Sequence, residues 1–141
     1  MKFASVRLVT NDFERLVAFY QKLSGLEPLH FADGFAEMRF EGIVLAISSE
    51  HLIRLYNESA ATAAANRSAI LEFQVDDVEA VFDRMHGAGA EVVMPAKIMP
   101  WGNISLLLRD PDGNLVNVFS KPMSTTDHVQ PDVLRGQKQK Q

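Results

Sequence analysis

The chain has 141 residues, the length of one ordinary domain, and 47% of them are hydrophobic and 23% charged, as is typical of a globular protein. A formal net charge of −4 without a basic patch argues against nucleic acid as a partner, and no apolar run approaches the roughly 20 residues that cross a bilayer. The absence of cysteine excludes disulfides, thiolate catalysis and cysteine-bound metals, and because no signal-peptide pattern is present we expect a cytoplasmic protein.

The first part of the chain predicts one strand, one helix and three further strands. Alternating, β-branched residues in "FASVRLVT" (3–10) indicate a strand, and Asp12 is a natural cap for the helix that follows. In "FERLVAFYQKLSG" (13–25) apolar residues recur at helical spacing until Gly25 ends the pattern. The three strand candidates after it are "LEPLHFA" (26–32), "FAEMRFE" (35–41) and "GIVLAISS" (42–49).

The same order of elements is predicted a second time. A small, polar, alanine-rich stretch at about 57–67 is interpreted as a linker, and Asp77, which lies 65 residues after Asp12, caps the second helix. The second set of elements is expected at 69–75, 78–90, 91–100, 102–110 and 113–120. A long repeat that occurs twice predicts an α+β domain of two pseudo-symmetric βαβββ modules, at about 1–56 and 68–121. The polar tail at 122–141 is expected to be frayed or packed on a partner chain.

Three stretches carry a resemblance to a known family. They are "TNDFERLVAFYQKLSGLEPL", "FQVDDVEAVFDRMHGAGAEVV" and "PWGNISLLLRDPDGNLVNVF". In this order they resemble the vicinal oxygen chelate superfamily of glyoxalase I, bleomycin-resistance proteins and extradiol dioxygenases, over about residues 2–121. The resemblance implies a curved sheet around a cleft in each module, a small-molecule ligand and a homodimer.

The resemblance also implies where metal-using members place their four ligands. These are His, Glu or Gln side chains that bind Zn, Ni, Fe or Mn. In this sequence the four positions fall at Ser5, Ala46, Ile70 and Asn117, the last being the usual position of a Glu behind "DPDGN". Because none of them offers an imidazole or a carboxylate, we expect no metal and no cofactor.

Strand alternation predicts which polar residues face the cleft. Val6 and Leu8 should pack under the first helix, which directs Ser5 and Arg7 to the cleft, and the same reasoning directs Glu72 there in the second module. Arg7 and Glu72 occupy equivalent positions and should lie within salt-bridge reach. The pair is either a structural ion pair that fills the space of a lost metal or a charged pair that orients a polar ligand.

Two further side chains complete the expected ligand site. Trp101, the only tryptophan, lies in "MPWGN" and either forms a stacking wall for a planar ligand or plugs the end of the sheet. Arg39 faces either the cleft or its rim. The expected ligand-binding residues are therefore Ser5, Arg7, Arg39, Glu72, Trp101 and Asn117.

The leading functional hypothesis is a metal-free small-molecule-binding protein that sequesters a drug or a planar metabolite, as bleomycin-resistance proteins do. It would have no catalytic residue. One alternative is a glyoxalase-like lyase, isomerase or dioxygenase with a shifted metal site. Another is a metal-free enzyme that uses Glu72 as its general base. The superfamily hosts many functions, so the fold alone cannot choose among them.

Overall fold

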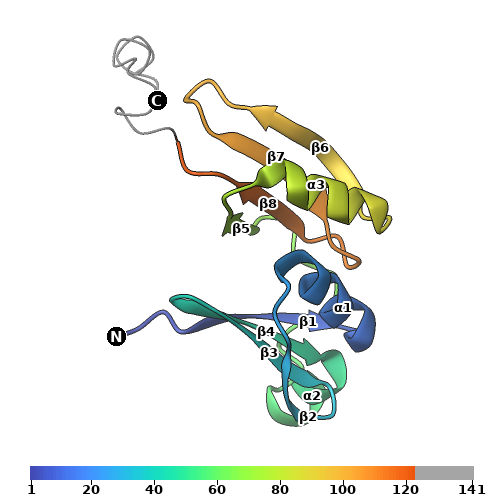
Figure 1. Ribbon diagram of the computed structural model, residues 1–141. Helices are drawn as coiled ribbons and strands as arrows, with labels where there is room; N and C mark the ends of the chain where they lie inside the picture. Colours follow the sequence, from blue (N-terminus) through green and yellow to red (C-terminus); the bar gives the residue numbers. More distant parts are fainter. Residues whose placement is uncertain (123–141) are drawn as a thin grey trace. The chain divides into compact units, whose positions relative to one another are not determined.

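Two four-stranded mixed sheets and three helices make up the computed structural model of the protein, which describes residues 1–122 (Figure 1). In chain order the elements are β1 (Ser5–Thr10), α1 (Phe13–Ser24), β2 (Leu29–Ala32), β3 (Phe35–Phe40), β4 (Ile43–Ser49), α2 (Glu50–Tyr56), β5 (Ile70–Gln74), α3 (Val78–Gly87), β6 (Glu91–Ile98), β7 (Ile104–Arg109) and β8 (Leu115–Phe119). The strand orders are β1-β4-β3-β2 and β5-β8-β7-β6. In each sheet one edge strand, β1 or β5, is parallel to its neighbour and the other pairs are antiparallel. This is the predicted α+β fold of two βαβββ modules.

The chain divides into two compact units. The first comprises Met1–Ala69 together with the turn Asp110–Asn114, and the second comprises Ile70–Arg109 and the residues from Leu115 on. The turn thus belongs to the first unit although the strands that it joins, β7 and β8, belong to the second. None of the helices in the described part of the chain has the length and apolar character of a membrane span. The tail expected at 122–141 lies outside the described residues, apart from Pro122.

The two predicted capping aspartates begin equivalent helices. The Asp12 side chain accepts a hydrogen bond from the Arg15 backbone N–H at 3.4 Å, and Asp77 accepts one from the Ala80 N–H at 3.0 Å. Helix α1 ends at Gly25, whose φ of +75° lies in the left-handed region that glycine adopts without steric cost. The helix boundaries therefore follow from the cap residues that the sequence displays.

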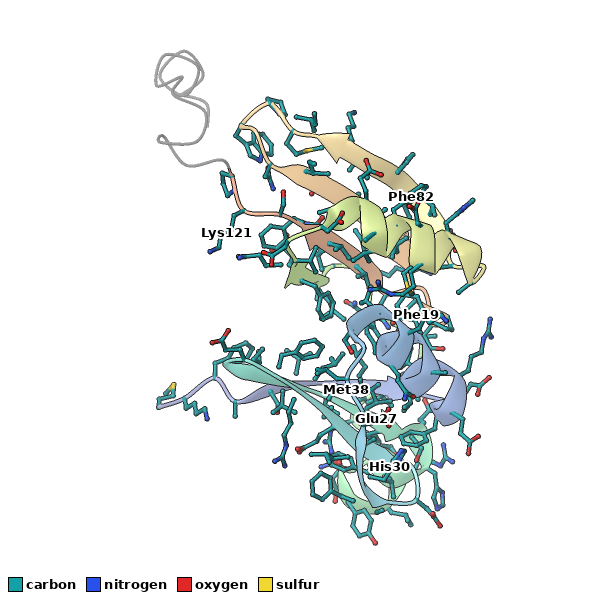
Figure 2. The ribbon with its side chains drawn as sticks, viewed as in Figure 1. Phe19, Glu27, His30, Met38, Phe82 and Lys121 are labelled. Atoms are coloured by element: carbon teal, nitrogen blue, oxygen red, sulfur yellow. The ribbon has the colours of Figure 1, made fainter. Side chains whose placement is uncertain are left out.

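One helix covers one face of the sheet in each unit: α1 packs against β3 and β4, and α3 packs against β6, β7 and β8 (Figure 1). The apolar residues buried there are Leu16, Val17, Tyr20, Leu23, Ala36, Met38, Leu45 and Ile47 in the first unit and Val78, Val81, Met85, Leu106, Leu108, Val116 and Val118 in the second. Met38, labelled in Figure 2, is fully buried. On β1 Leu8 is buried and Arg7 is exposed, as the predicted strand phase requires.

Helix α2 is an element that the sequence pattern does not predict. Ser49 caps it by accepting a hydrogen bond from the Leu52 N–H at 3.4 Å, and Glu50 pairs with Arg54 one turn later at 3.4 Å. Its seven residues are fewer than the roughly 12–15 that an isolated helix needs, so packing has to stabilise it. Ile53 is buried and α2 contacts β4 and β1. A helix this short offers too few turns for periodicity to detect.

A buried hydrogen bond from α1 holds the turn Asp110–Asn114. Tyr20 Oη donates to Asp110 Oδ2 at 2.6 Å, and both residues are buried. The same carboxylate accepts from the backbone N–H groups of Asp112 and Asn114, both at 2.9 Å, and from Asn114 Nδ2 at 2.8 Å. Burial and the neighbouring Asp110 charge raise the pKa of Tyr20, so its phenol keeps the proton that it donates.

Replacing Tyr20 with Phe should lower the free energy of unfolding by about 1.5–3 kcal/mol, because a buried carboxylate loses a charge-assisted donor. Tyr56 is 76% exposed, and Tyr56→Phe provides a matched control with an effect below about 0.5 kcal/mol. Urea unfolding followed by circular dichroism measures both variants. Equal effects of the two substitutions would show that the Tyr20–Asp110 bond contributes nothing to stability.

The stability advantage of the wild type over Tyr20→Phe should decline as the pH rises above the ordinary tyrosine pKa of 10.0. Tyr20 of the unfolded chain ionises there, whereas the folded phenol has a raised pKa and stays protonated, so rising pH favours unfolding of the wild type. Urea midpoints of the two proteins should differ by a constant amount up to about pH 9 and converge beyond about pH 10. A difference that persists undiminished at about pH 11 would contradict this linkage.

Candidate functional site

Each sheet has one face opposite to α1 or α3, and we call these two surfaces the open faces, although Ala46 and Ser48 on the first of them are buried. Directly paired residues on neighbouring strands point to the same side of a sheet, so the strand register defines both surfaces. The first open face consists of Ser5, Arg7, Val9, Phe35, Glu37, Arg39, Val44, Ala46 and Ser48. The second consists of Ile70, Glu72, Gln74, Ser105, Leu107, Arg109, Leu115, Asn117 and Phe119. Five of the six predicted ligand-binding residues lie on these faces.

A chain of side-chain hydrogen bonds crosses the second open face. Ser105 Oγ on β7 donates to Asn117 Oδ1 at 2.9 Å, and Asn117 Nδ2 donates to Glu72 Oε2 on β5 at 2.9 Å. Asn117 lies directly opposite Glu72 in the β5–β8 register. Since both ends of its amide are engaged, Asn117 holds the exposed Glu72 carboxylate in one orientation.

A guanidinium and two aromatic rings lie together in the first unit. Arg39 Nε and Nη2 donate to Glu37 Oε1 at 3.1 and 2.9 Å, and Glu37 lies two residues away on the same face of β3. The guanidinium carbon of Arg39 is 5.6 Å from the centroid of the Phe31 ring, which is itself 6.3 Å from the Phe35 ring. The Arg39 side chain is 56% exposed, so this cation–aromatic platform is accessible to a ligand.

Arg7 is an exposed cation on the edge strand β1. Its Nη2 donates to Asn57 Oδ1 at 3.0 Å, directly after the end of α2. The partner of Arg7 in this hydrogen bond is therefore a neutral amide. Glu72 belongs to the second unit, and its ion pair with Arg7 stays a prediction.

The four positions that the resemblance assigns to metal ligands form two diagonal pairs. In the first sheet Ser5 pairs with Val44 of β4, and Ala46 lies two residues after Val44 on that strand. In the second sheet Ile70 pairs with Leu115 of β8, and Asn117 lies two residues after Leu115. Ala46 is buried, and Ile70 is 50% exposed. Within residues 1–122, no group of three or more His, Cys, Asp or Glu side chains is arranged to hold a metal ion. The four positions offer one hydroxyl and one amide, which do not fit a catalytic divalent cation.

Trp101 lies at the end of the second unit, in the turn between β6 and β7. The backbone closes this turn through Gly102 N–H to Met99 O at 2.9 Å and Met99 N–H to Asn103 O at 2.8 Å. Gly102 has a φ of +102°, which only glycine tolerates well. Trp101 is 46% exposed, and its function as a wall for a planar ligand stays a prediction.

Two residues join these arrangements although the sequence does not mark them. Ser105 lies in "ISLLLR", where nearly every residue is apolar and alternation cannot show which side faces the helix. Phe31 reaches Arg39 across the irregular pairing between β2 and β3, where the register shifts between His30 and Ala32. Both contacts depend on strand register, which the sequence pattern does not supply.

Comparison with known proteins identifies the family. The model of the Glyoxalase/Bleomycin resistance protein/Dioxygenase superfamily matches residues 2–118, and the chain belongs to this superfamily. The resemblance inferred from the capping aspartates, the repeated modules and the "DPDGN" turn is therefore confirmed.

Individual proteins are similar to this chain over most of its length. The uncharacterized protein YraH of Bacillus subtilis (strain 168) is 28% identical over 126 residues, which are 84% of this chain and 98% of that protein. A glyoxalase/bleomycin resistance protein/dioxygenase family enzyme from Burkholderia phytofirmans PsJN gives a TM-score of 0.74 at 18% identity, covering 85% of this chain and 98% of that one. A glyoxalase-related enzyme from Fulvimarina pelagi gives a TM-score of 0.74 at 22% identity, covering 86% and 88%. At these identities the solved structures establish the fold.

Asn117→Asp should lower the free energy of unfolding by roughly 0.5–1 kcal/mol near neutral pH, because a carboxylate then lies opposite Glu72 where an amide now donates. The cost should shrink below about pH 4, where carboxyl groups take up protons. Gln74→Glu makes the same amide-to-acid change at an exposed position of the same face and is the control. Chemical unfolding at both pH values measures the two variants. A cost at neutral pH no larger than that of Gln74→Glu would contradict the Asn117–Glu72 bond.

Proposed function

We propose that the protein binds a small planar or amphipathic molecule on its open faces, without a metal ion and without transforming it. It would sequester the ligand in the manner of a bleomycin-resistance protein. The observation that carries the proposal is the side chain at position 117. Where the resemblance places a metal-binding carboxylate, Asn117 has a neutral amide whose oxygen accepts from Ser105 and whose nitrogen donates to Glu72. An amide held in this way is a poor ligand for a divalent cation.

The first open face supplies groups that would recognise a planar ligand bearing oxygen acceptors. The Phe31 ring, beside the Arg39 guanidinium, offers an aromatic face to a flat molecule, and the Phe35 ring, tilted by 59° to it, adds an apolar wall. Arg7 adds an exposed guanidinium that can donate to a carboxylate, phosphate or carbonyl group. The homodimer that the resemblance implies would present this surface twice.

A metal-free enzyme with Glu72 as general base is the second candidate. The observation that favours it is the hydrogen bond from Asn117, which holds an exposed carboxylate in one orientation, as a positioned base requires. Glu72→Gln distinguishes the two candidates. An enzyme should lose roughly 100-fold or more of its turnover of a bound compound, whereas a sequestering protein shows no turnover with or without the substitution.

A thermal-shift screen of the full-length protein against planar antibiotics and metabolites should find a ligand, since a compound at 100 times its Kd stabilises the native state by about 2.7 kcal/mol. Arg39→Gln should weaken that ligand about three- to tenfold, because it removes a cation–aromatic contact worth about 0.5–1.5 kcal/mol. Calorimetric titration measures the affinities. Arg15→Gln, an exposed arginine on α1, is the control and should bind as the wild type does. Wild-type affinity in the Arg39 variant would contradict binding on the first open face.

A further inference from the structure

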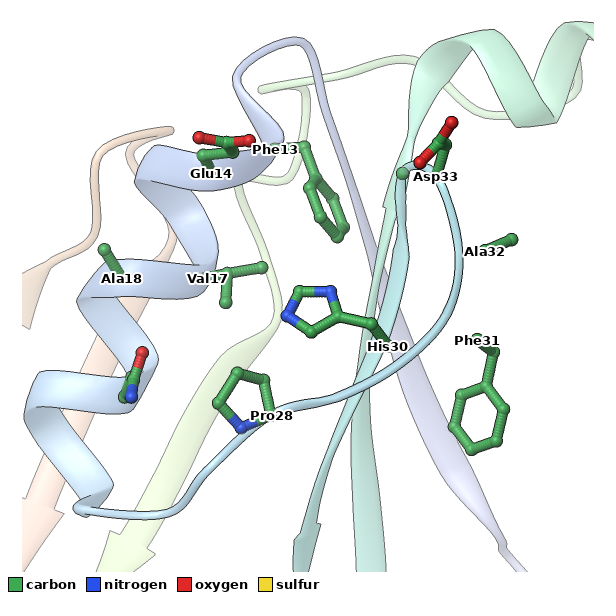
Figure 3. A pocket seen from close by; sticks show the side chains of 11 residues that line it. Phe13, Glu14, Val17, Ala18, Pro28, His30, Phe31, Ala32 and Asp33 are labelled. Atoms are coloured by element: carbon green, nitrogen blue, oxygen red, sulfur yellow. The ribbon is translucent and has the colours of Figure 1, made fainter.

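We infer that the first unit holds a second small-molecule site, in the groove between α1 and β2, and that this site takes an organic cation with an aromatic or aliphatic body. The groove has a volume of about 830 Å³, within the range of roughly 300–1,000 Å³ typical of ligand pockets (Figure 3). It shares only Phe31 with the platform described above, and Figure 3 shows the Phe31 ring pointing away from α1. The inference is therefore independent of the proposed function.

Apolar and aromatic side chains form the walls of the groove. Figure 3 shows His30 projecting from β2 toward α1, where its ring faces Phe13, Val17 and Pro28. The imidazole and the Phe13 ring meet edge to face, with centroids 6.0 Å apart and an interplanar angle of 68°. These walls suit the hydrocarbon part of a ligand, and the rings offer π faces to a cation.

The carboxylates that line the groove give it one sign of charge. Glu14 in the first turn of α1 and Asp33 in the β2–β3 turn border it at the end where α1 begins (Figure 3). No lysine or arginine among residues 1–122 lines it, and neither carboxylate belongs to an ion pair within these residues. A cation is attracted to this end of the groove and an anion is repelled from it.

The turn that carries Asp33 is fixed in place. Gly34 has a φ of +80°, and a Cβ there would come within 2.7 Å of Ser49 Oγ. The Gly34 carbonyl also accepts a hydrogen bond from the Ser49 N–H at 2.8 Å. Ser49 caps α2, so the turn is packed tightly against the start of that helix. A groove whose charged end is already ordered loses less conformational freedom when a ligand binds.

Titration of the isotope-labelled full-length protein with benzyltrimethylammonium, followed by NMR, tests the site. The resonances of the His30 ring, the Ala18 methyl group and the Gly34 amide should shift together and saturate with one affinity. Phenylacetate, an anion with a similar aromatic body, should bind at least about tenfold more weakly because the groove is acidic. Equal affinities for the two probes, or shifts confined to the open faces, would overturn the inference.

Variants separate the groove from general surface charge. Glu14→Gln combined with Asp33→Asn should weaken the cation about five- to tenfold, because both carboxylates at the charged end are lost. The matched control is Glu41→Gln combined with Glu79→Gln. It also removes two exposed acids, one in a turn and one in the first turn of a helix. This control should change the affinity for the cation less than about twofold. If the double variant does not fold, Asp33→Asn alone should weaken binding about two- to threefold. Wild-type affinity in a folded groove variant would overturn the inference.

Discussion

A four-stranded sheet has two faces, and in each unit α1 or α3 covers one of them. Because side chains alternate along a strand, every residue of β1 or β5 is assigned either to the helix-covered core or to the open face. Leu8 is buried while its neighbour Arg7 is exposed, and in the second unit Val118 is buried while Asn117 points to the other side. A register slip of one residue would exchange the two sets. The requirement to bury one face under a helix thus determines where the polar groups of the candidate site lie.

The acidic "DPDGN" turn shows how a motif rich in carboxylates can be structural. Asp110 accepts hydrogen bonds from Tyr20, from two backbone N–H groups of its own turn and from the side chain of Asn114. Four donors satisfy a buried carboxylate, which would otherwise be costly to remove from water. The polar groups of β8, the strand that follows the turn, are separate from this structural role. There the neutral amide of Asn117 joins Ser105 to Glu72.

Much of the fold could be predicted from the sequence because its signals are local. Asp12 and Asp77 are helix caps that can be read directly, and both long helices have regular apolar spacing. Helix α2 could not be predicted, since its seven residues depend on the burial of Ile53 against strands that are distant in the sequence. The faces of Arg7 and Glu72 followed from alternation, but their hydrogen-bond partners did not.

Those partners depend on register and on bulges. The bond from Ser105 to Asn117 requires the β7–β8 register, and the contact of Arg39 with Phe31 crosses a shift in the β2–β3 pairing. The groove between α1 and β2 likewise requires the His30 side chain to face the helix. Because His30 is an exposed residue on a short edge strand, the sequence alone does not show which way its side chain points. Apart from α2, the elements could be predicted from the sequence, whereas most contacts between elements could not.

We propose that ligand binding in this member of the superfamily does not involve a metal. The most direct measurement uses the ligand that the thermal-shift screen finds. Its affinity is measured by calorimetry for two samples, protein treated with a chelator and protein that has received one equivalent of Zn²⁺, Ni²⁺, Fe²⁺ or Mn²⁺. Since Asn117 is already engaged by Ser105 and Glu72, the affinity should be the same with and without metal. Loss of binding after chelation, restored by one of these ions at a stoichiometry of one, would contradict the claim.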